Sequence, residues 1–99
     1  MFSIILLRSL QSSAKAYEYL GFIMEKDGNF RDALTNYEKA WRLTNSNNPN
    51  IGFKLALNYM RCKCYTDSID TARLVLEKYP DFPRIRKDVL ERARNALKN

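Results

Sequence analysis

An internal repeat constrains the fold of this chain more than any other feature of its sequence. Leu20 recurs as Leu55, and Phe30 recurs as Tyr65, so that matched positions are 35 residues apart. A period of about 34 residues is typical of proteins built from stacked helical hairpins, because one unit cannot bury its apolar face alone. The repeat therefore predicts an all-α fold in which neighbouring units stack on one another.

The apolar spacing divides each unit into two helices. In the first unit, apolar and small residues follow the i, i+3, i+4, i+7 pattern of one helix face at Tyr17, Leu20, Gly21 and Met24. The pattern resumes at Phe30 after a short polar break. We therefore expect two helices of about 13 residues in each unit, joined by a turn of about three residues.

Two glycines of the first unit have predicted structural roles. Gly28 stands between Asp27 and Asn29, where it can adopt a positive φ without a Cβ penalty while Asn29 caps the next helix. Glycine inside a helix costs about 1 kcal/mol relative to alanine, so Gly21 requires a packing reason. We expect Gly21 to mark a close approach of two helices, beside a bulky neighbour such as Phe30.

The sequence divides into four segments. A single helix follows the second unit, with Pro83 in its predicted first turn and an apolar stripe from Ile85 to Leu97. A helix that is polar on its outer side is what a solenoid uses to cover its last repeat. The four segments are 1–13, which does not match the repeat, 14–49 and 50–80, which are the two repeats, and 81–99, which is the C-terminal capping helix.

The pattern of small and large residues resembles the tetratricopeptide repeat, so the expected fold is an α-solenoid fragment of such helical hairpins. The second unit fits less well, because Gly52 stands where the pattern prefers an aromatic residue, Ser68 replaces alanine and Ala72 replaces an aromatic residue. The signature residues expected in the core are Tyr17, Leu20, Gly21, Phe30, Ala33, Tyr37, Ala40, Leu55, Ala56, Tyr59, Tyr65 and Pro80.

A narrower resemblance covers nearly all of the chain after residue 13. The segments 14–21, 48–59 and 79–94 are similar to the extreme C-terminal end of the tetratricopeptide repeat protein 21 family. Members of that family are the large repeat subunit of intraflagellar transport complex A. The resemblance implies a protein-interaction scaffold that contacts other subunits of that complex and acts in retrograde ciliary transport and cilium assembly. It also implies a place in the cytoplasm, the cilium or the ciliary base, and no catalytic residue.

The first helix of each pair lines the concave side of a repeat stack, which predicts a groove for a protein partner. The candidate residues of this groove are Phe22, Phe53, Leu57 and Met60. An exposed apolar strip of this kind is typical of a protein contact. A preceding repeat, or the segment 1–13 folding back, is an equally suitable cover for the same strip.

Basic residues concentrate in the final segment. The chain carries a net charge of +6, and half of that excess lies in residues 81–99. The basic face of the capping helix is formed by Arg84, Arg86, Lys87, Arg92 and Arg94. Such a face suits an acidic subunit surface or anionic lipid, although an ordinary solvated helix exterior explains it more simply.

The composition argues against an enzyme. The chain has no histidine, which is the commonest general base and transition-metal ligand. Cys62 and Cys64 cannot supply the four ligands of a structural zinc site, and we expect them to be reduced thiols of a cytosolic protein. We therefore expect no catalytic activity, no cofactor, no metal and no small-molecule substrate.

The start of the chain carries no membrane-spanning signal, because its apolar run is far shorter than the roughly 20 residues that a span requires. Arg8 with several serines gives only a weak indication of a mitochondrial presequence.

Two other functions compete with the ciliary one. The first is a generic tetratricopeptide adaptor in another cytosolic complex. The second, an RNA-binding repeat, is less favoured because most aromatic residues occupy core positions, where rings cannot stack on bases. We therefore expect no nucleic-acid partner.

Overall fold

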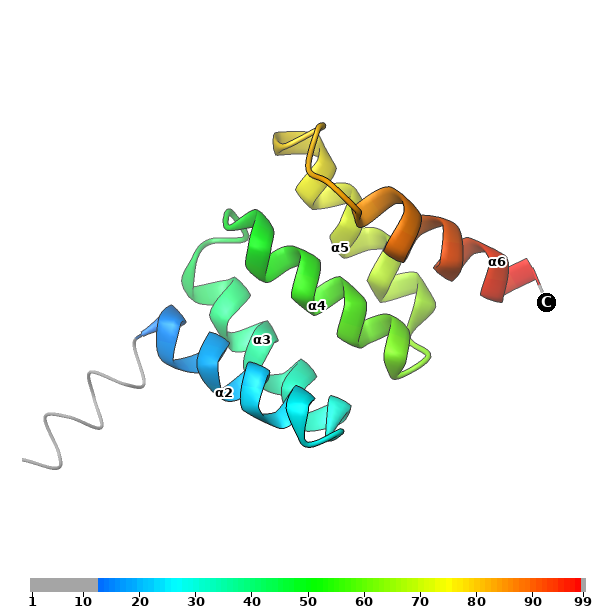
Figure 1. Ribbon diagram of the computed structural model, residues 1–99. Coiled ribbons are helices and arrows are strands. Elements are labelled where there is room, and N and C mark those ends of the chain that lie inside the picture. The colour runs from blue at the N-terminus through cyan, green and yellow to red at the C-terminus, as the bar shows by residue number, and fades with distance from the viewer. Residues whose placement is uncertain (1–12, 99) are drawn as a thin grey trace, which may run out of the picture.

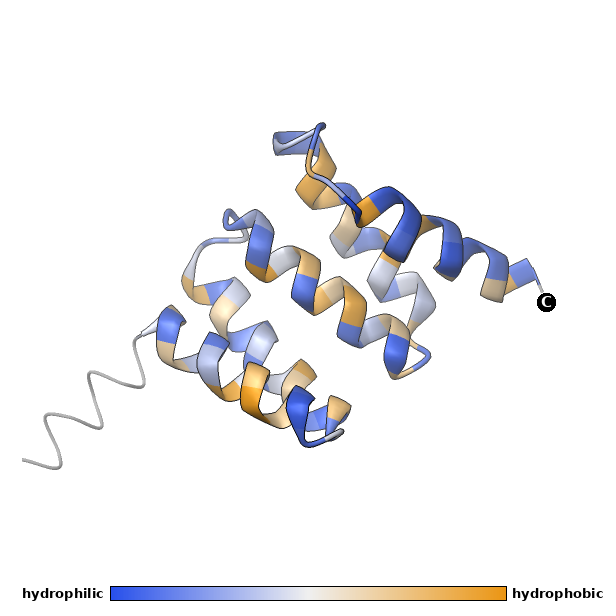
Figure 2. Ribbon diagram, viewed as in Figure 1, coloured by the Kyte–Doolittle hydropathy of each residue, from blue (hydrophilic) through white to orange (hydrophobic). Residues whose placement is uncertain are grey.

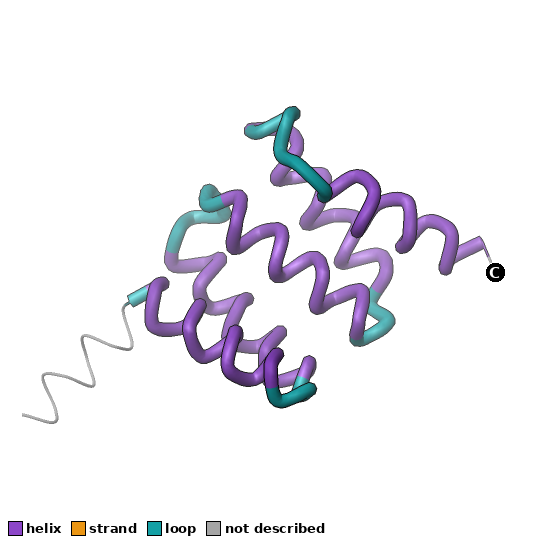
Figure 3. The backbone as a smooth tube through the Cα atoms, in the orientation of Figure 1, coloured by secondary structure: helices purple, strands orange, loops and turns teal. Residues whose placement is uncertain are grey.

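The structure is a computed structural model that describes residues 13–98, and these residues are helical with no β-strand. The predicted all-α fold is confirmed (Figure 3). Of the segment 1–13, only Ser13 lies within the described residues. The elements are, in chain order, α2 (Ala14–Lys26), α3 (Phe30–Leu43), α4 (Pro49–Arg61), α5 (Tyr65–Lys78), the π-helix η1 (Arg86–Glu91) and α6 (Arg92–Lys98).

Side-chain caps determine where the helices begin. The side-chain oxygens of Ser13, Asn29 and Asn48 each accept a hydrogen bond from a backbone N–H in the first turn of α2, α3 and α4, respectively. Pro49 occupies the first turn of α4, where its missing N–H costs nothing. Gly28 has a φ of 77° in the turn between α2 and α3. The predicted roles of Gly28 and Asn29 are therefore confirmed.

The helices form two hairpins that stack in two layers. In Figure 1, α2 and α4 lie nearer the viewer, while α3 and α5 lie behind them. Helix α3 packs against both α2 and α4, and α5 packs against α4, η1 and α6. The last helix therefore covers the second hairpin, as expected of a capping helix.

Two glycines allow the helices to approach closely. A Cβ on Gly21 would lie 2.7–2.9 Å from ring atoms of Tyr37, and a Cβ on Gly52 would lie 2.8 Å from Cζ3 of Trp41. The predicted packing reason for Gly21 is confirmed, with Tyr37 rather than Phe30 filling the space. At position 52, where the repeat pattern prefers an aromatic residue, the Trp41 ring from α3 occupies that volume instead.

Most of the predicted core is observed, with two corrections. Leu20 is 42% exposed. Its equivalent Leu55 is only 2% exposed, because α4 packs against α3 of the hairpin before it, whereas no hairpin precedes α2 among residues 13–98. Pro80 is also exposed, because it lies in the turn after α5. The other signature residues are buried (Gly21, Ala33, Tyr37, Ala40, Leu55, Ala56) or half-buried (Tyr17, Phe30, Tyr59, Tyr65).

The capping helix begins later than predicted. Arg84 has a φ of 72°, so the backbone after Pro83 is left-handed and the helix starts only at Ile85. Pro83 therefore lies in the preceding turn rather than in the first turn of the helix. The predicted apolar stripe packs onto the second hairpin as far as Ala93, whereas Leu97 is 54% exposed at the end of α6, which projects past its neighbours in Figure 1.

Candidate protein-interaction surface

Two ion pairs connect the first helices of the two hairpins. The Nζ atom of Lys54 lies 2.9 Å from a carboxylate oxygen of Glu18, and Arg61 pairs with Glu25. Both acids come from α2 and both bases come from α4, each seven residues apart, so each pair of like residues lies on one helix face. These contacts were not predicted from the sequence. The only hint of them in the sequence is that the two acids and the two bases have the same seven-residue spacing. That spacing predicts ion pairs only once α2 and α4 are known to be neighbours.

Glu25 is the centre of a polar network that joins α2, α3 and α4. The hydroxyl of Tyr37 donates to its Oε1 atom at 3.0 Å, and Nδ2 of Asn58 donates to its Oε2 atom at 3.1 Å. The pKa of Tyr37 is raised well above its ordinary value, mainly by burial and secondly by the nearby Glu25 carboxylate. Tyr37 and Asn58 are both fully buried, so Glu25 joins the two helices of the first hairpin through Tyr37 and connects that hairpin to the second through Asn58.

A second tyrosine contact joins the hairpins through α3 and α4. The Tyr59 hydroxyl donates to Oε1 of Glu38 at 3.1 Å, and burial together with this carboxylate raises the pKa of Tyr59.

Cys62 and Cys64 are both free thiols, and burial raises the pKa of Cys62. A raised thiol pKa disfavours the nucleophilic thiolate, so Cys62 has the chemistry of a packing residue.

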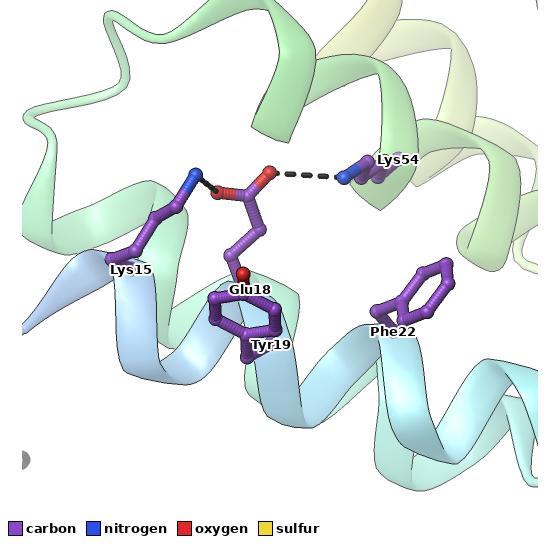
Figure 4. A pocket seen from close by; sticks show the side chains of 5 residues that line it. All are labelled: Lys15, Glu18, Tyr19, Phe22 and Lys54. Atoms are coloured by element: carbon purple, nitrogen blue, oxygen red, sulfur yellow. Dashed lines mark hydrogen bonds and ion pairs between the residues drawn. The ribbon is translucent and has the colours of Figure 1, made fainter.

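The surface between α2 and α4 contains two hollows that share one aromatic side chain. The first has a volume of about 210 Å³, and Figure 4 shows Tyr19 and Phe22 on α2 beside the chain of ion pairs from Lys15 through Glu18 to Lys54. The second has a volume of about 360 Å³ and is lined by Phe22, Glu25, Lys26, Phe30 and Arg61. We call these two hollows together the α2–α4 groove. Its exposed aromatic rings can make apolar contacts with a binding partner, and its ammonium groups can bind negative charge.

The structure does not join the predicted groove residues into one apolar strip. Phe22 is 43% exposed and lines the α2–α4 groove. Phe53 instead packs against Phe82, with ring centroids 5.7 Å apart, because the segment before the capping helix brings this ring to α4. Leu57 packs against the core, and Met60 is half-buried. The expected exposure of Phe53 and Leu57 is thus corrected, because Phe82 packs against Phe53 and the core packs against Leu57.

The five basic residues predicted on the capping segment are all exposed, and Figure 2 shows a mainly hydrophilic outer side for this last helix. Nε of Arg84 lies 2.8 Å from a carboxylate oxygen of Asp88, and the Arg84 guanidinium lies over the Phe53 ring at 5.6 Å. Nη2 of Arg86 donates a hydrogen bond to the carbonyl oxygen of Pro80 at 3.4 Å. Arg84 therefore contacts α4 through the Phe53 ring and is not simply part of a solvated face.

Within residues 13–98, no group of three or more cysteine, aspartate or glutamate side chains is placed to hold a metal ion. Over the same residues, no helix combines the length and the apolar character that crossing a bilayer demands.

A family model and individual relatives of known name all point to the same protein family. Residues 5–94 match the family model described as the tetratricopeptide repeat protein 21 C-terminal ARM domain. Tetratricopeptide repeat protein 21B of Homo sapiens is 52% identical over 92 residues, which are 93% of this chain and 7% of that protein. Tetratricopeptide repeat protein 21A of Homo sapiens is 49% identical over 88 residues, covering 89% of this chain and 7% of the relative.

The match extends to a nematode. The tetratricopeptide repeat protein 21 homolog of Caenorhabditis elegans is 34% identical over 84 residues, which are 85% of this chain and 6% of that protein. The chain spans about 7% of the length of the human relatives. The match to the C-terminal family model accounts for nearly all of the described helices. This chain therefore belongs to the tetratricopeptide repeat protein 21 family and corresponds to the C-terminal end of its members.

Proposed function

We propose that this chain is a protein-interaction scaffold element of intraflagellar transport complex A, with a role in retrograde ciliary transport and cilium assembly. The observation that carries the proposal is membership of the tetratricopeptide repeat protein 21 family across residues 5–94. The protein acts in the cytoplasm, at the ciliary base or in the cilium, and its partners are the other subunits of the complex.

The stacked hairpins support a scaffold role physically. Ion pairs and tyrosine–glutamate hydrogen bonds connect successive helices, so that the exposed side chains of α2 and α4 have fixed relative positions. Fixed positions reduce the ordering cost of association. Exposed aromatic rings at Tyr19 and Phe22 supply the kind of side chain that is enriched in protein interfaces.

Affinity purification of the tagged 99-residue chain from ciliated cells tests this function. The expected result is enrichment of complex A subunits over a tag-only control, measured by quantitative mass spectrometry. Absence of every complex A subunit from the eluate of a folded, expressed chain would contradict the proposal. Recovery of a different cytosolic complex in their place would identify the chain as a general tetratricopeptide adaptor.

A further inference from the structure

We propose that the α2–α4 groove binds a protein segment in which acidic side chains flank one apolar side chain. The proposal rests on the scaffold function above and specifies the chemistry of the partner. Its geometric basis is that two hollows, one lined by Tyr19 and Phe22 and the other by Phe22 and Phe30, meet at the Phe22 ring. An extended segment crossing both hollows therefore passes directly over an exposed aromatic side chain.

The charges that this groove presents to solvent are mainly positive. Four cationic and two acidic residues line it, and the acids are the better covered: the Glu18 side chain is 15% exposed, whereas that of Lys15 is 75% exposed. Likewise, the Glu25 side chain is 19% exposed and that of Arg61 is 38% exposed. Both carboxylates already accept bonds from within the chain, whereas the Lys15 side chain stays exposed although it pairs with Glu18 at 3.7 Å, and Lys26 is exposed as well. Negative charge on a partner is therefore the complement.

The apolar component of the partner follows from the aromatic side chains. Tyr19 is 62% and Phe22 is 43% exposed, and they lie on the same side of α2 in Figure 4. The Lys26 ammonium lies over the Phe22 ring, 5.2 Å from its centroid, so a cation is placed at the apolar contact itself. A side chain such as phenylalanine or leucine fits against these rings, and carboxylates on either side of it reach the lysines.

Charge also distinguishes this partner from the other possible occupants. A basic peptide would bring cations toward Lys15 and Lys26, with the only carboxylates of the groove already bonded. The segment 1–13 carries Arg8 and no acidic residue, so it has the wrong charge for this groove. The capping segment 81–99 of a second copy has an excess of basic residues and is repelled in the same way.

A peptide titration of the complete 99-residue chain tests the proposal. The probe is a fluorescein-labelled decapeptide with a central phenylalanine flanked by aspartate and glutamate, followed by fluorescence anisotropy. Two matched peptides replace either the phenylalanine with alanine or all acids with lysine. We expect each matched peptide to bind at least about ten-fold more weakly, and binding of the acidic peptide to weaken as sodium chloride rises from about 50 to about 500 mM.

Surface variants locate the binding site. Phe22→Ala, and separately the pair Lys15→Ala with Lys26→Ala, should each weaken the acidic peptide at least about ten-fold. The pair Arg86→Ala with Lys87→Ala removes the same charge from the capping helix and should leave the affinity within about two-fold. All of these residues are exposed, and circular dichroism checks that each variant stays folded. Equal binding of the lysine peptide, or unchanged affinity of the Phe22→Ala protein, overturns the proposal.

Purification of the same variants separates the two proposals. If the wild-type chain recovers complex A subunits and the Lys15→Ala, Lys26→Ala protein recovers equal amounts, the scaffold function stands and the groove proposal fails. If the wild-type chain recovers none of them but still binds the acidic peptide through Phe22, the groove proposal stands and the complex A assignment fails.

Discussion

Replacing Gly52 with alanine tests how closely the two hairpins pack. A Cβ at this position would lie 2.5 Å from Cγ2 of Val75 and 2.8 Å from Cζ3 of Trp41, so side chains from two other helices must move. Val75 is 1% and Trp41 is 8% exposed, so neither has free space to move into. Overpacking a dense core costs about 1–3 kcal/mol, while alanine regains about 1 kcal/mol of helix propensity. We expect a net loss of about 1 kcal/mol in the free energy of unfolding.

Urea denaturation followed by far-ultraviolet circular dichroism measures this loss, which corresponds to a fall in Tm of about 4–8 °C for a domain of this size. Val75→Ala provides the matched control, because it removes the Cγ2 atom that the new methyl group meets. The cost of Gly52→Ala should therefore be smaller in the Val75→Ala protein than in the parent. If Gly52→Ala instead stabilises the chain by about 1 kcal/mol, helix propensity alone decides and the close approach is refuted.

Three further predictions use the same denaturation assay. Gly28→Ala should lose about 1 kcal/mol, because a φ of 77° is unfavourable for alanine; equal stability would contradict this conformation. Tyr37→Phe should lose about 1 kcal/mol because it removes a donor to Glu25, and a gain would argue against the bond. The folded-state pKa values of Tyr37 and Tyr59 are raised, so their contribution to stability is complete below the ordinary pKa of about 10 and is lost progressively from there up to the folded values, because the unfolded tyrosines lose their protons first. The fall in stability between about pH 8 and about pH 11 should be smaller in the double Tyr37→Phe, Tyr59→Phe protein, and an equal fall would count against burial of the two hydroxyl groups beside their carboxylates.

The features predicted correctly from the sequence depend on neighbouring residues or on the repeat itself. The turn at Asp27–Asn29 follows from glycine and asparagine at a helix boundary. The close approach at Gly21 follows from the cost of glycine inside a helix. Both signals are present within one unit, so they require no knowledge of how the units pack against each other.

The features that the sequence missed depend on the path of distant segments. The cover over Phe53 comes from Phe82 and Arg84, whose positions follow from a left-handed backbone at Arg84 that no sequence pattern indicated. The exposure of Leu20 depends on what precedes α2, because a repeat signature describes a position inside a continuous stack. The α2–α4 groove likewise combines residues from two repeats and becomes visible only when the hairpins are stacked.

A chimera tests the central claim, that this chain is the C-terminal scaffold element of a ciliary transport subunit. In ciliated cells lacking tetratricopeptide repeat protein 21B, its matched C-terminal stretch is replaced with residues 5–94 of this chain, and the frequency of retrograde transport along cilia is recorded. We expect a frequency equal to that restored by the unaltered relative. A chimera that is expressed and folded at the normal level but leaves retrograde transport as low as in the deficient cells would contradict it.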